Sequence, residues 1–549
     1  MLKQIELKNF KAFSENGAIA ELAPITLICG QNSAGKSSLM QSLLMLAQTI
    51  QLQDNNLDSS DIVTSGKYVD LGNFNSLVNS HDSTKTLQIS LTFTNTKLTS
   101  KHKENKLSLS FESSMKNNED NNNFGRLKNI EFSSTLSNLE NFNFTLNRTN
   151  NDRSFSFDPD TNFFKVLASL PVGPREIHIH RRIQREKNQS LREKLIKSYQ
   201  HALKNSSSKA ELSKISEQLD DIDYQEQRSE MMEYGDNISY GNLHYKTIDK
   251  LKSYVLSNRD RFINIRRGSG SYLPSSYDDQ FIENREITIA EMYIQRIASY
   301  ISAMNSALST SLGQLSYLGP LRSAPQRSYS HKVGKALSVG NSGEDIVQML
   351  RVSVEKSNNT HKFIEDYLNE ECSNLGIPYE FEASLKSDDV AGDLVILNVT
   401  DKRTNTIVAL TDVGFGISQL LPIIVQATYS YETSKNKTGL MLVEQPELHL
   451  HPNLQAKIAD FIIRKSKPAL NKEGLQWIIE THSESLIRRL QRRVKEKQLK
   501  PEDISILYVD RVGDYGSVIK RLRLDEYGDF IDSWPDGFFV DAFSDLTDE

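Results

Sequence analysis

The run Gly-Gln-Asn-Ser-Ala-Gly-Lys-Ser at residues 30–37 restricts the fold of this chain more than any other feature. The apolar segment at 25–29 precedes it, and leucines at helical spacing follow it over 37–48. A short, continuous apolar run is typical of a strand that is buried on both faces of a parallel sheet. The order strand, glycine loop, helix therefore predicts an α/β fold built on a parallel sheet.

The chemistry of this loop suits a nucleotide phosphate. Its glycines let backbone N–H groups turn inward, and the N-terminus of the following helix adds to the anion site. Lys36 supplies a cation for the β- and γ-phosphate oxygens, and Ser37 supplies a hydroxyl for Mg²⁺. ATP and Mg²⁺ are thus the expected cofactors. The predicted nucleotide-binding residues are Gly30, Gln31, Asn32, Ser33, Ala34, Gly35, Lys36, Ser37 and Ser38.

A second apolar segment, at 439–443, ends in the polar run Glu-Gln-Pro-Glu at 444–447. Carboxylates at a strand end next to a phosphate loop can hold Mg²⁺ and activate water. We expect Ser37 and Glu444 to be the metal ligands. The usual catalytic glutamate is replaced here by Gln445, which can orient a water but cannot accept its proton. Glu447 is the alternative base.

Two further motifs complete the candidate site. The segment 478–484 is another strand that ends in a polar turn, where His482 is predicted to contact the γ-phosphate or position the attacking water. The predicted catalytic residues are Glu444, Gln445, Glu447 and His482. A lone histidine at a strand end is more often structural, but the chain order after the first two motifs favours a catalytic role.

The segment 412–422 has the pattern of a second anion-binding turn at the start of a helix. It is expected to cap the γ-phosphate held by another copy of the chain. The residues predicted to act in this way are Gly414, Gly416, Ser418 and Gln419. The alternative is an ordinary glycine turn with Ser418 as a helix N-cap.

In this order, the four motifs resemble the ABC-type ATPases of the SMC, RecF and OLD group. The phosphate loop is their P-loop, GFGISQ stands at the signature position, VEQPELHLHP at the Walker B and D-loop position, and THSE at the switch-histidine position. The resemblance covers the segments 1–100 and 311–510. It implies an α/β ABC-type P-loop ATPase head.

The segments between the motifs predict an antiparallel β lobe and a helical insertion. Alternating residues at 87–91 and 107–111 indicate strands, and helical spacing recurs at 191–219 and 294–304. We expect four parts: an N-terminal ATPase lobe with the P-loop and β subdomain (1–165), a helical insertion (166–310), a C-terminal ATPase lobe (311–510) and a C-terminal tail (511–549).

LGPLRSAPQR at 318–327, the EQPE variant and WPDGFF at 534–539 resemble a narrower bacterial AAA-ATPase family. It includes PtuA, the ATPase of Septu-type and some retron-associated antiphage systems, and Arg322 matches the family's GPLR arginine. The resemblance implies an HNH nuclease partner (PtuB-like) and a role in phage defence, while the expected action of the 412–422 turn on another copy predicts head-to-tail dimers or higher oligomers. OLD nucleases carry a DxD metal site that is missing after His482, so nuclease activity is expected to belong to another protein.

Composition narrows the setting. Cys29 and Cys372 are too few for a disulfide framework or a zinc cluster, and no apolar run is long enough to span a membrane, so a cytoplasmic protein is expected. The net charge of −6 argues against general nucleic-acid binding. Basic residues do gather at 178–187 and 488–500, which is consistent either with phosphate contacts or with ordinary solvated helices.

Three functions remain open from the sequence. As an enzyme, the protein hydrolyses ATP with Glu447 and His482. As a scaffold, it hydrolyses ATP slowly because Gln445 is no base, and bound ATP clamps a nuclease partner in place. As a free-standing SMC- or RecF-like ATPase, it acts in DNA repair or maintenance. A transporter ATPase is disfavoured, since that class lacks the paired EQPELHLHP and THSE motifs.

Overall fold

The structure is a computed structural model in which the chain forms two compact units. The first comprises Met1–Asn95, Glu104–Ile130 and Asn305–Glu549, and the second comprises Thr96–Lys103 and Glu131–Met304. The residues that the structure describes are 1–51, 62–94, 102–115, 123–136, 142–148, 155–159, 174–204, 212–222, 287–331, 337–355, 361–388, 392–434, 438–469, 473–513 and 516–535.

In the described part of the first unit, six strands form a largely parallel sheet in the order β19-β18-β3-β17-β16-β9. β19 is antiparallel to β18, and the other neighbours are parallel. Every residue of β3, β16 and β17 is buried, which confirms the strand buried on both faces that the run 25–29 predicts. The bounds are β3 Ile25–Gly30, β9 Leu315–Leu318, β16 Leu440–Glu444, β17 Gln476–Glu480, β18 Ile504–Arg511 and β19 Ser517–Leu522.

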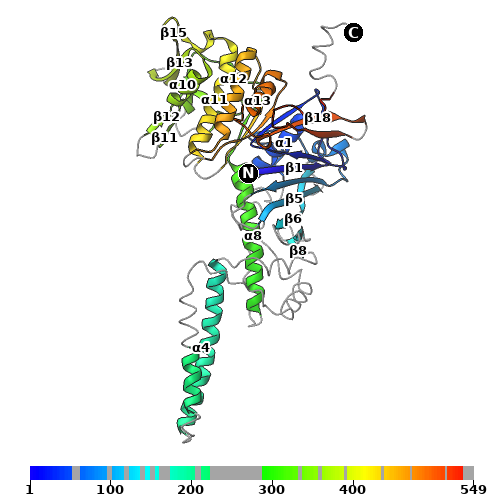
Figure 1. The fold of residues 1–549 in the computed structure, drawn as a ribbon, viewed down its shortest axis with the longest axis vertical. Coiled ribbons are helices and arrows are strands. Elements are labelled where there is room, and N and C mark those ends of the chain that lie inside the picture. Colours follow the sequence, from blue (N-terminus) through cyan, green and yellow to red (C-terminus); the bar gives the residue numbers. More distant parts are fainter. Residues whose placement is uncertain are drawn as a thin grey trace. The chain divides into compact units, whose positions relative to one another are not determined.

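Helices follow three of these strands directly in the chain (Figure 1). α1 (Lys36–Gln51) follows β3, α12 (Pro452–Ser466) follows β16, and α13 (Glu484–Lys495) follows β17. α12 starts with a proline, whose missing N–H costs nothing in the first turn. α13 starts at the N-cap Ser483, whose hydroxyl accepts a hydrogen bond from the N–H of Leu486 at 3.1 Å. β3, β16 and β17 therefore each end at a loop that leads into a helix.

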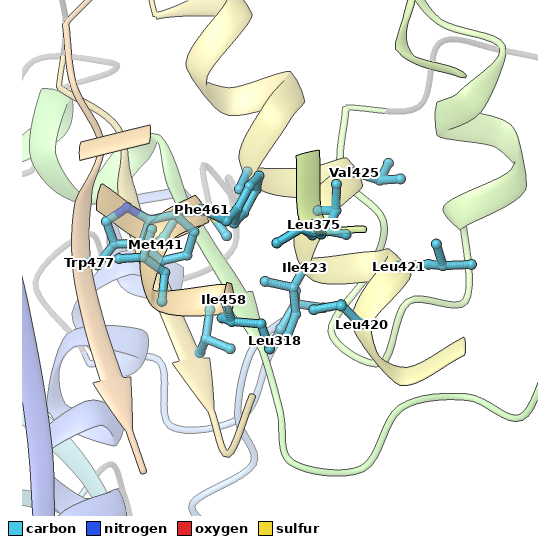
Figure 2. Close-up of a cluster of buried hydrophobic side chains, with 14 of the residues drawn as sticks. Leu318, Leu375, Leu420, Leu421, Ile423, Val425, Met441, Ile458, Phe461 and Trp477 are labelled. Atoms are coloured by element: carbon cyan, nitrogen blue, oxygen red, sulfur yellow. The ribbon is translucent and has the colours of Figure 1, made fainter. Parts of the chain in front are cut away.

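The core of the first unit lies between the sheet and helices α10 (Ile364–Leu375), α11 (Phe415–Thr433) and α12 (Figure 2). Phe461 of α12 packs edge-on against Trp477 of β17, with ring centroids 6.3 Å apart. Figure 2 shows Leu318 of β9 beside Ile423 of α11. This packing fixes the carboxyl ends of β16 and β17 relative to α11.

Antiparallel strands that lie wholly or mainly in the first unit pair in the order β2-β1-β4-β5-β6. Leu87 of β4 pairs with Phe111 of β5, so the segments expected to be strands lie side by side and confirm the antiparallel β lobe. The Asn-rich stretch 116–122 lies outside the described residues. The bounds are β1 Leu2–Lys8, β2 Ala18–Glu21, β4 Leu87–Phe93, β5 His102–Met115 and β6 Asn123–Leu136.

Smaller elements complete the first unit. A described sheet of four strands carries Phe381, Val395 and Val399 into the core. Its strands are β10 Tyr329–Ser330, β13 Tyr379–Asp388, β14 Gly392–Asp401 and β15 Thr406–Ala409, and β11 Ser353–Glu355 pairs with β12 His361–Phe363. The short helices are α2 Phe74–Leu77, η1 Asn79–His81, α9 Ile346–Leu350, η3 Leu410–Asp412 and η4 Pro501–Asp503.

The second unit holds most of the helical insertion. α4 (Pro174–Lys204), the helical residues 212–222 and α8 (Ile287–Gly313), whose residues from Asn305 on belong to the first unit, confirm helices where the pattern predicts them. The hairpin turn expected at 205–208 and the side chains of the basic group 178–187 lie outside the described residues. Two strands, β7 (Phe142–Arg148) and β8 (Phe155–Pro159), pair antiparallel. None of the helices in the described ranges is long and apolar enough to cross a membrane.

Candidate functional site

The loop after β3 has a backbone that glycine makes possible. Gly30 and Gly35 have φ values of 139° and 105°, and Ser33 is left-handed at 61°. A Cβ atom on Gly30 would lie 2.1 Å from the carbonyl oxygen of Val509 in β18, so no other residue fits there. The loop opens directly into α1, whose free N–H groups face it. Residues 31–33 are exposed, which leaves the loop accessible to an anion.

Lys36 lies beneath this loop and is only 4% exposed. Its Nζ donates to the carbonyl oxygens of Gly30 at 3.1 Å and Gln31 at 2.8 Å. Burial lowers the pKa of Lys36, and the carboxylate of Glu480 acts in the opposite direction. An ammonium group held by neutral carbonyls is poorly compensated in a buried place, so an anion in the loop would stabilise it.

The carboxyl ends of β16 and β17 carry two glutamates in register, and the end of β17 adjoins the loop. Glu444 pairs with Glu480 across the two strands, and Glu480 pairs on its other side with Ile28 of β3. The hydroxyl of Ser37 donates to Glu480 Oε2 at 3.1 Å. Glu444 Oε1 instead accepts a hydrogen bond from the Tyr317 hydroxyl at 2.8 Å. Burial raises the pKa of both glutamates.

Arg322 holds the turn that follows β16. The side chain is 7% exposed, and its guanidinium donates to the backbone oxygens of Glu444 at 2.8 Å and Gln445 at 3.3 Å. Burial lowers the pKa of Arg322 to about 10, although Glu447 and Glu444 oppose that shift. Gln445 itself is left-handed, with φ of 45°, and its N–H donates to the carbonyl oxygen of Glu480 at 2.7 Å. The strand end is thus fixed from two sides.

Glu447 faces the turn that carries His482. Its Oε1 accepts a hydrogen bond from the backbone N–H of His482 at 2.7 Å, and the residue is 9% exposed. Burial raises the pKa of Glu447, and the bond from His482 opposes that shift. Burial, followed by the charge of Lys36, lowers the pKa of His482, so its imidazole is neutral at pH 7 and can either donate or accept a hydrogen bond.

The start of α11 contacts the turn after β16 rather than the phosphate loop. The Phe415 ring packs edge-on against His449 at 5.0 Å, and a Cβ on Gly416 would lie 2.4 Å from the His449 carbonyl oxygen. Ser418 and Gln419 are 6% and 5% exposed, and the Ser418 hydroxyl donates to the Phe415 oxygen at 2.7 Å. Among the described residues, no hydrogen bond or ring contact joins the four predicted signature residues to 30–38.

The basic cluster on α13 is largely neutralised by neighbouring carboxylates. Arg489 and Arg493 both bond Asp460 of α12, at 2.7 Å each. Arg488 pairs with Glu484, and Arg492 pairs with Glu496. This pattern is that of a solvated, ion-paired helix, and it weakens the case for a phosphate-binding surface there.

The residues brought together fit a nucleotide phosphate and a divalent cation. They comprise backbone N–H groups at a helix start, a buried ammonium, and a hydroxyl that donates a hydrogen bond to a carboxylate. Sequence reasoning missed Tyr317 and Glu480. Glu480 was visible at the end of an apolar run, but only the pairing of β17 with β3 shows that it reaches Ser37.

Comparison with known protein families matches residues 1–487 to the AAA ATPase domain family. Residues 499–548 match a protein of unknown function, DUF3696. No curated protein matches the chain. Among solved structures, the Smc head domain bound to the C-terminal domain of ScpA from Pyrococcus furiosus is 12% identical, with a TM-score of 0.36 over 95% of this chain and 96% of that one. The SMC head domain from Thermotoga maritima is 10% identical, with a TM-score of 0.33 over 95% and 98%.

Proposed function

This chain belongs to the AAA ATPase domain family, and we propose that it binds ATP with Mg²⁺ and uses the bound nucleotide as a slowly hydrolysed clamp. The expected fold class, an α/β ABC-type P-loop ATPase head with an antiparallel β lobe and a helical insertion, holds. The observation that carries the proposal is the loop of β3. There the buried Lys36 bonds the carbonyl oxygen of Gly30 at the end of β3, and the Ser37 hydroxyl bonds Glu480 at the end of the neighbouring strand β17.

Each residue has a distinct part in this proposal. Bound ATP supplies the γ-phosphoryl group that water can attack. Lys36 neutralises phosphate charge from beneath the loop, and Ser37 and Glu444 hold Mg²⁺. The neutral His482 donates or accepts a hydrogen bond at the end of β17. Domain limits 1–165, 166–310, 311–510 and 511–549 and a cytoplasmic location stay predictions.

Slow hydrolysis follows from the two candidate bases. Gln445 stands where a catalytic glutamate is usual, and an amide cannot accept the proton of the attacking water. The other carboxylate, Glu447, is buried and accepts the N–H of His482, so it holds that turn in place. Among the described residues, Glu447 Oε2 has no hydrogen-bond partner, so Glu447 is the remaining candidate base, held beside the His482 turn and not at the position of Gln445. We propose that hydrolysis through it is slow and that bound ATP persists.

We propose that the clamp joins copies head to tail, in dimers or higher oligomers. Gly414 is exposed and Gly416 is half-buried at the start of α11, so their backbone can reach a nucleotide held by a neighbouring copy. Ser418 and Gln419 are buried, and they support the helix start from within. The four signature residues thus divide into two that face outward and two that hold the turn.

The partner that we propose is an HNH nuclease of the PtuB kind, in antiphage defence. Support comes from the resemblance at 318–327, the EQPE variant and the terminal WPDGFF. The chain itself is not proposed to cut nucleic acid. The alternative is a free-standing SMC- or RecF-like ATPase in DNA repair or maintenance, which needs no stable nuclease.

Co-purification from the native host, with phosphate release measured in parallel, tests this function. The wild-type protein should retain a nuclease and release little phosphate. Lys36→Ala should lose the nuclease, whereas Lys520→Ala, an exposed lysine of β19, should keep it. Fast phosphate release by a protein that purifies alone would contradict the clamp and support the repair-type alternative.

A further inference from the structure

We infer that Glu480 is the positioning residue for the metal-binding hydroxyl of Ser37, and that it links the His482 turn to the metal. This inference rests on the proposed function, since it concerns the Mg²⁺ that accompanies ATP. Glu480 is the last residue of β17. Its side chain is 5% exposed, so it acts inside the site and not at the surface.

The hydrogen bond between Ser37 and Glu480 fixes the direction of the hydroxyl. The Ser37 hydroxyl donates a hydrogen bond to Glu480 Oε2 at 3.1 Å. A serine hydroxyl whose hydrogen points at a carboxylate keeps its oxygen lone pairs for a cation. A metal ligand whose other side is held by a carboxylate binds with a fixed orientation and higher basicity. Glu480 can thus prepare Ser37 for Mg²⁺ without contacting the ion.

The sheet topology explains why Glu480, and not Glu444, contacts Ser37. β17 lies between β3 and β16, so its last residue adjoins the phosphate loop while the end of β16 lies one strand further away. Glu480 is in register with Ile28, two residues before the loop begins at Gly30. Glu444 has its hydrogen bond with Tyr317 of β9, on the far side of β16.

The backbone of Glu480 extends the link to both neighbouring turns. Its carbonyl oxygen accepts the N–H of Gln445 at 2.7 Å, and the next N–H, that of Thr481, donates to Ile28 at 3.1 Å. His482 follows directly, with its own N–H on Glu447. One residue therefore connects the metal-binding hydroxyl to the water-positioning glutamine and to the switch histidine.

A Mg²⁺ titration of nucleotide binding tests the inference. Binding of a fluorescent ATP analogue to the full chain is followed at increasing Mg²⁺ and also in EDTA. Glu480→Gln should raise the Mg²⁺ midpoint about ten- to a hundredfold, as loss of a partner of a metal ligand does, and should leave binding in EDTA unchanged. Glu484→Gln, at a half-buried residue four positions on that pairs with Arg488, should leave the midpoint as in the wild type.

A second set of variants separates positioning from a merely structural effect. If Glu480 acts through Ser37, then adding Glu480→Gln to Ser37→Ala should not raise the midpoint further, whereas adding Glu444→Gln should. Should Glu480→Gln fail to fold, Glu480→Asp keeps the charge but shortens the side chain away from Ser37, and its midpoint should also rise. An unchanged midpoint in a folded variant, or full additivity with Ser37→Ala, overturns the inference alone. Absence of nucleotide binding by the wild type overturns the proposed function and the inference together.

Discussion

The ends of β16 and β17 are neighbours in one sheet and both carry a glutamate at the same register, yet they are held in different ways. The end of β16 is fixed by the protein itself, through Tyr317 on the Glu444 carboxylate and Arg322 on the backbone. The end of β17 reaches the phosphate loop, through Glu480 on Ser37. Two strand ends that look equivalent in sequence therefore have different tasks.

This difference is the basis of the proposed function, nucleotide binding with slow hydrolysis. In that proposal the β17 end serves binding, because Glu480 accepts the hydrogen bond of the Ser37 hydroxyl and His482 follows directly in the chain. The β16 end presents an amide, Gln445, on a turn that is rigidly held. Changes to Glu480 should therefore affect metal and nucleotide binding, whereas changes to Gln445 should affect turnover and changes to Arg322 should affect stability.

Gln445→Glu should give the end of β16 a proton acceptor, and it should have the largest effect of these changes, on turnover. A carboxylate at this position can accept the proton of the attacking water, and general-base catalysis contributes about 100- to 10,000-fold. Phosphate release at saturating ATP should rise by at least ~100-fold. Glu447→Gln is the matched variant, and it should leave the residual rate nearly unchanged. A large loss of turnover on that change would instead identify Glu447 as the base.

Lys36→Ala should abolish nucleotide binding, on which the proposed roles of both strand ends depend. The variant removes a buried cation whose loss is expected to cost about 3 kcal/mol or more of binding free energy, which is more than 100-fold in affinity. Equilibrium binding of labelled ATP measures the change, and Lys520→Ala is the control. Affinity within a few-fold of the wild type would mean that the loop does not hold the phosphates.

Arg322→Ala should damage the β16 end alone. It leaves the carbonyl oxygens of Glu444 and Gln445 buried without their donor, at an expected cost of about 2–3 kcal/mol of unfolding free energy. Arg327→Ala, in the same loop but 72% exposed and paired with Asp412, should cost less than ~1 kcal/mol. Urea unfolding measures the loss of unfolding free energy in both variants. Equal losses would contradict the conclusion that Arg322 holds the end of β16.

The smallest effect concerns charge at the two strand ends. Burial raises the folded-state pKa of Glu444 and of Glu480 above the ordinary value near 4.5. At a pH between the ordinary and the raised pKa, the folded state therefore binds more protons than the unfolded state. Stability without Mg²⁺ should therefore fall as pH rises through that window. Glu444→Gln or Glu480→Gln should raise the unfolding free energy at pH 7.5, by less than Arg322→Ala lowers it. This gain should vanish near pH 4.5. A gain that persists at low pH would show that charge is not the cause.

The local pattern of the sequence was sufficient for the phosphate loop and its surroundings. β3, the loop and α1 are contiguous, and the strands at 87–91 and 107–111 alternate clearly, so each could be predicted from nearby residues alone. The motifs at 444–447 and 478–484 also fall at strand ends, as predicted.

What could not be predicted depends on the pairing of distant segments. The bond from Ser37 to Glu480 requires β17 to lie beside β3, and chain order alone does not give that neighbour. The ion pairs of Arg489 and Arg493 depend on Asp460 of α12, which lies about 30 positions away in sequence. Burial of Ser418 and Gln419 reflects packing of the α11 start, which a glycine pattern does not show.

The central claim, an ATP clamp with slow turnover, is tested most directly by the fate of bound nucleotide. Purified protein is loaded with radiolabelled ATP and Mg²⁺, freed of unbound nucleotide, and sampled over time for bound ATP and ADP. The account predicts that wild-type protein retains mainly ATP for many minutes, whereas Gln445→Glu converts it rapidly to ADP. Rapid conversion to ADP by the wild type, or no retained nucleotide, would contradict it.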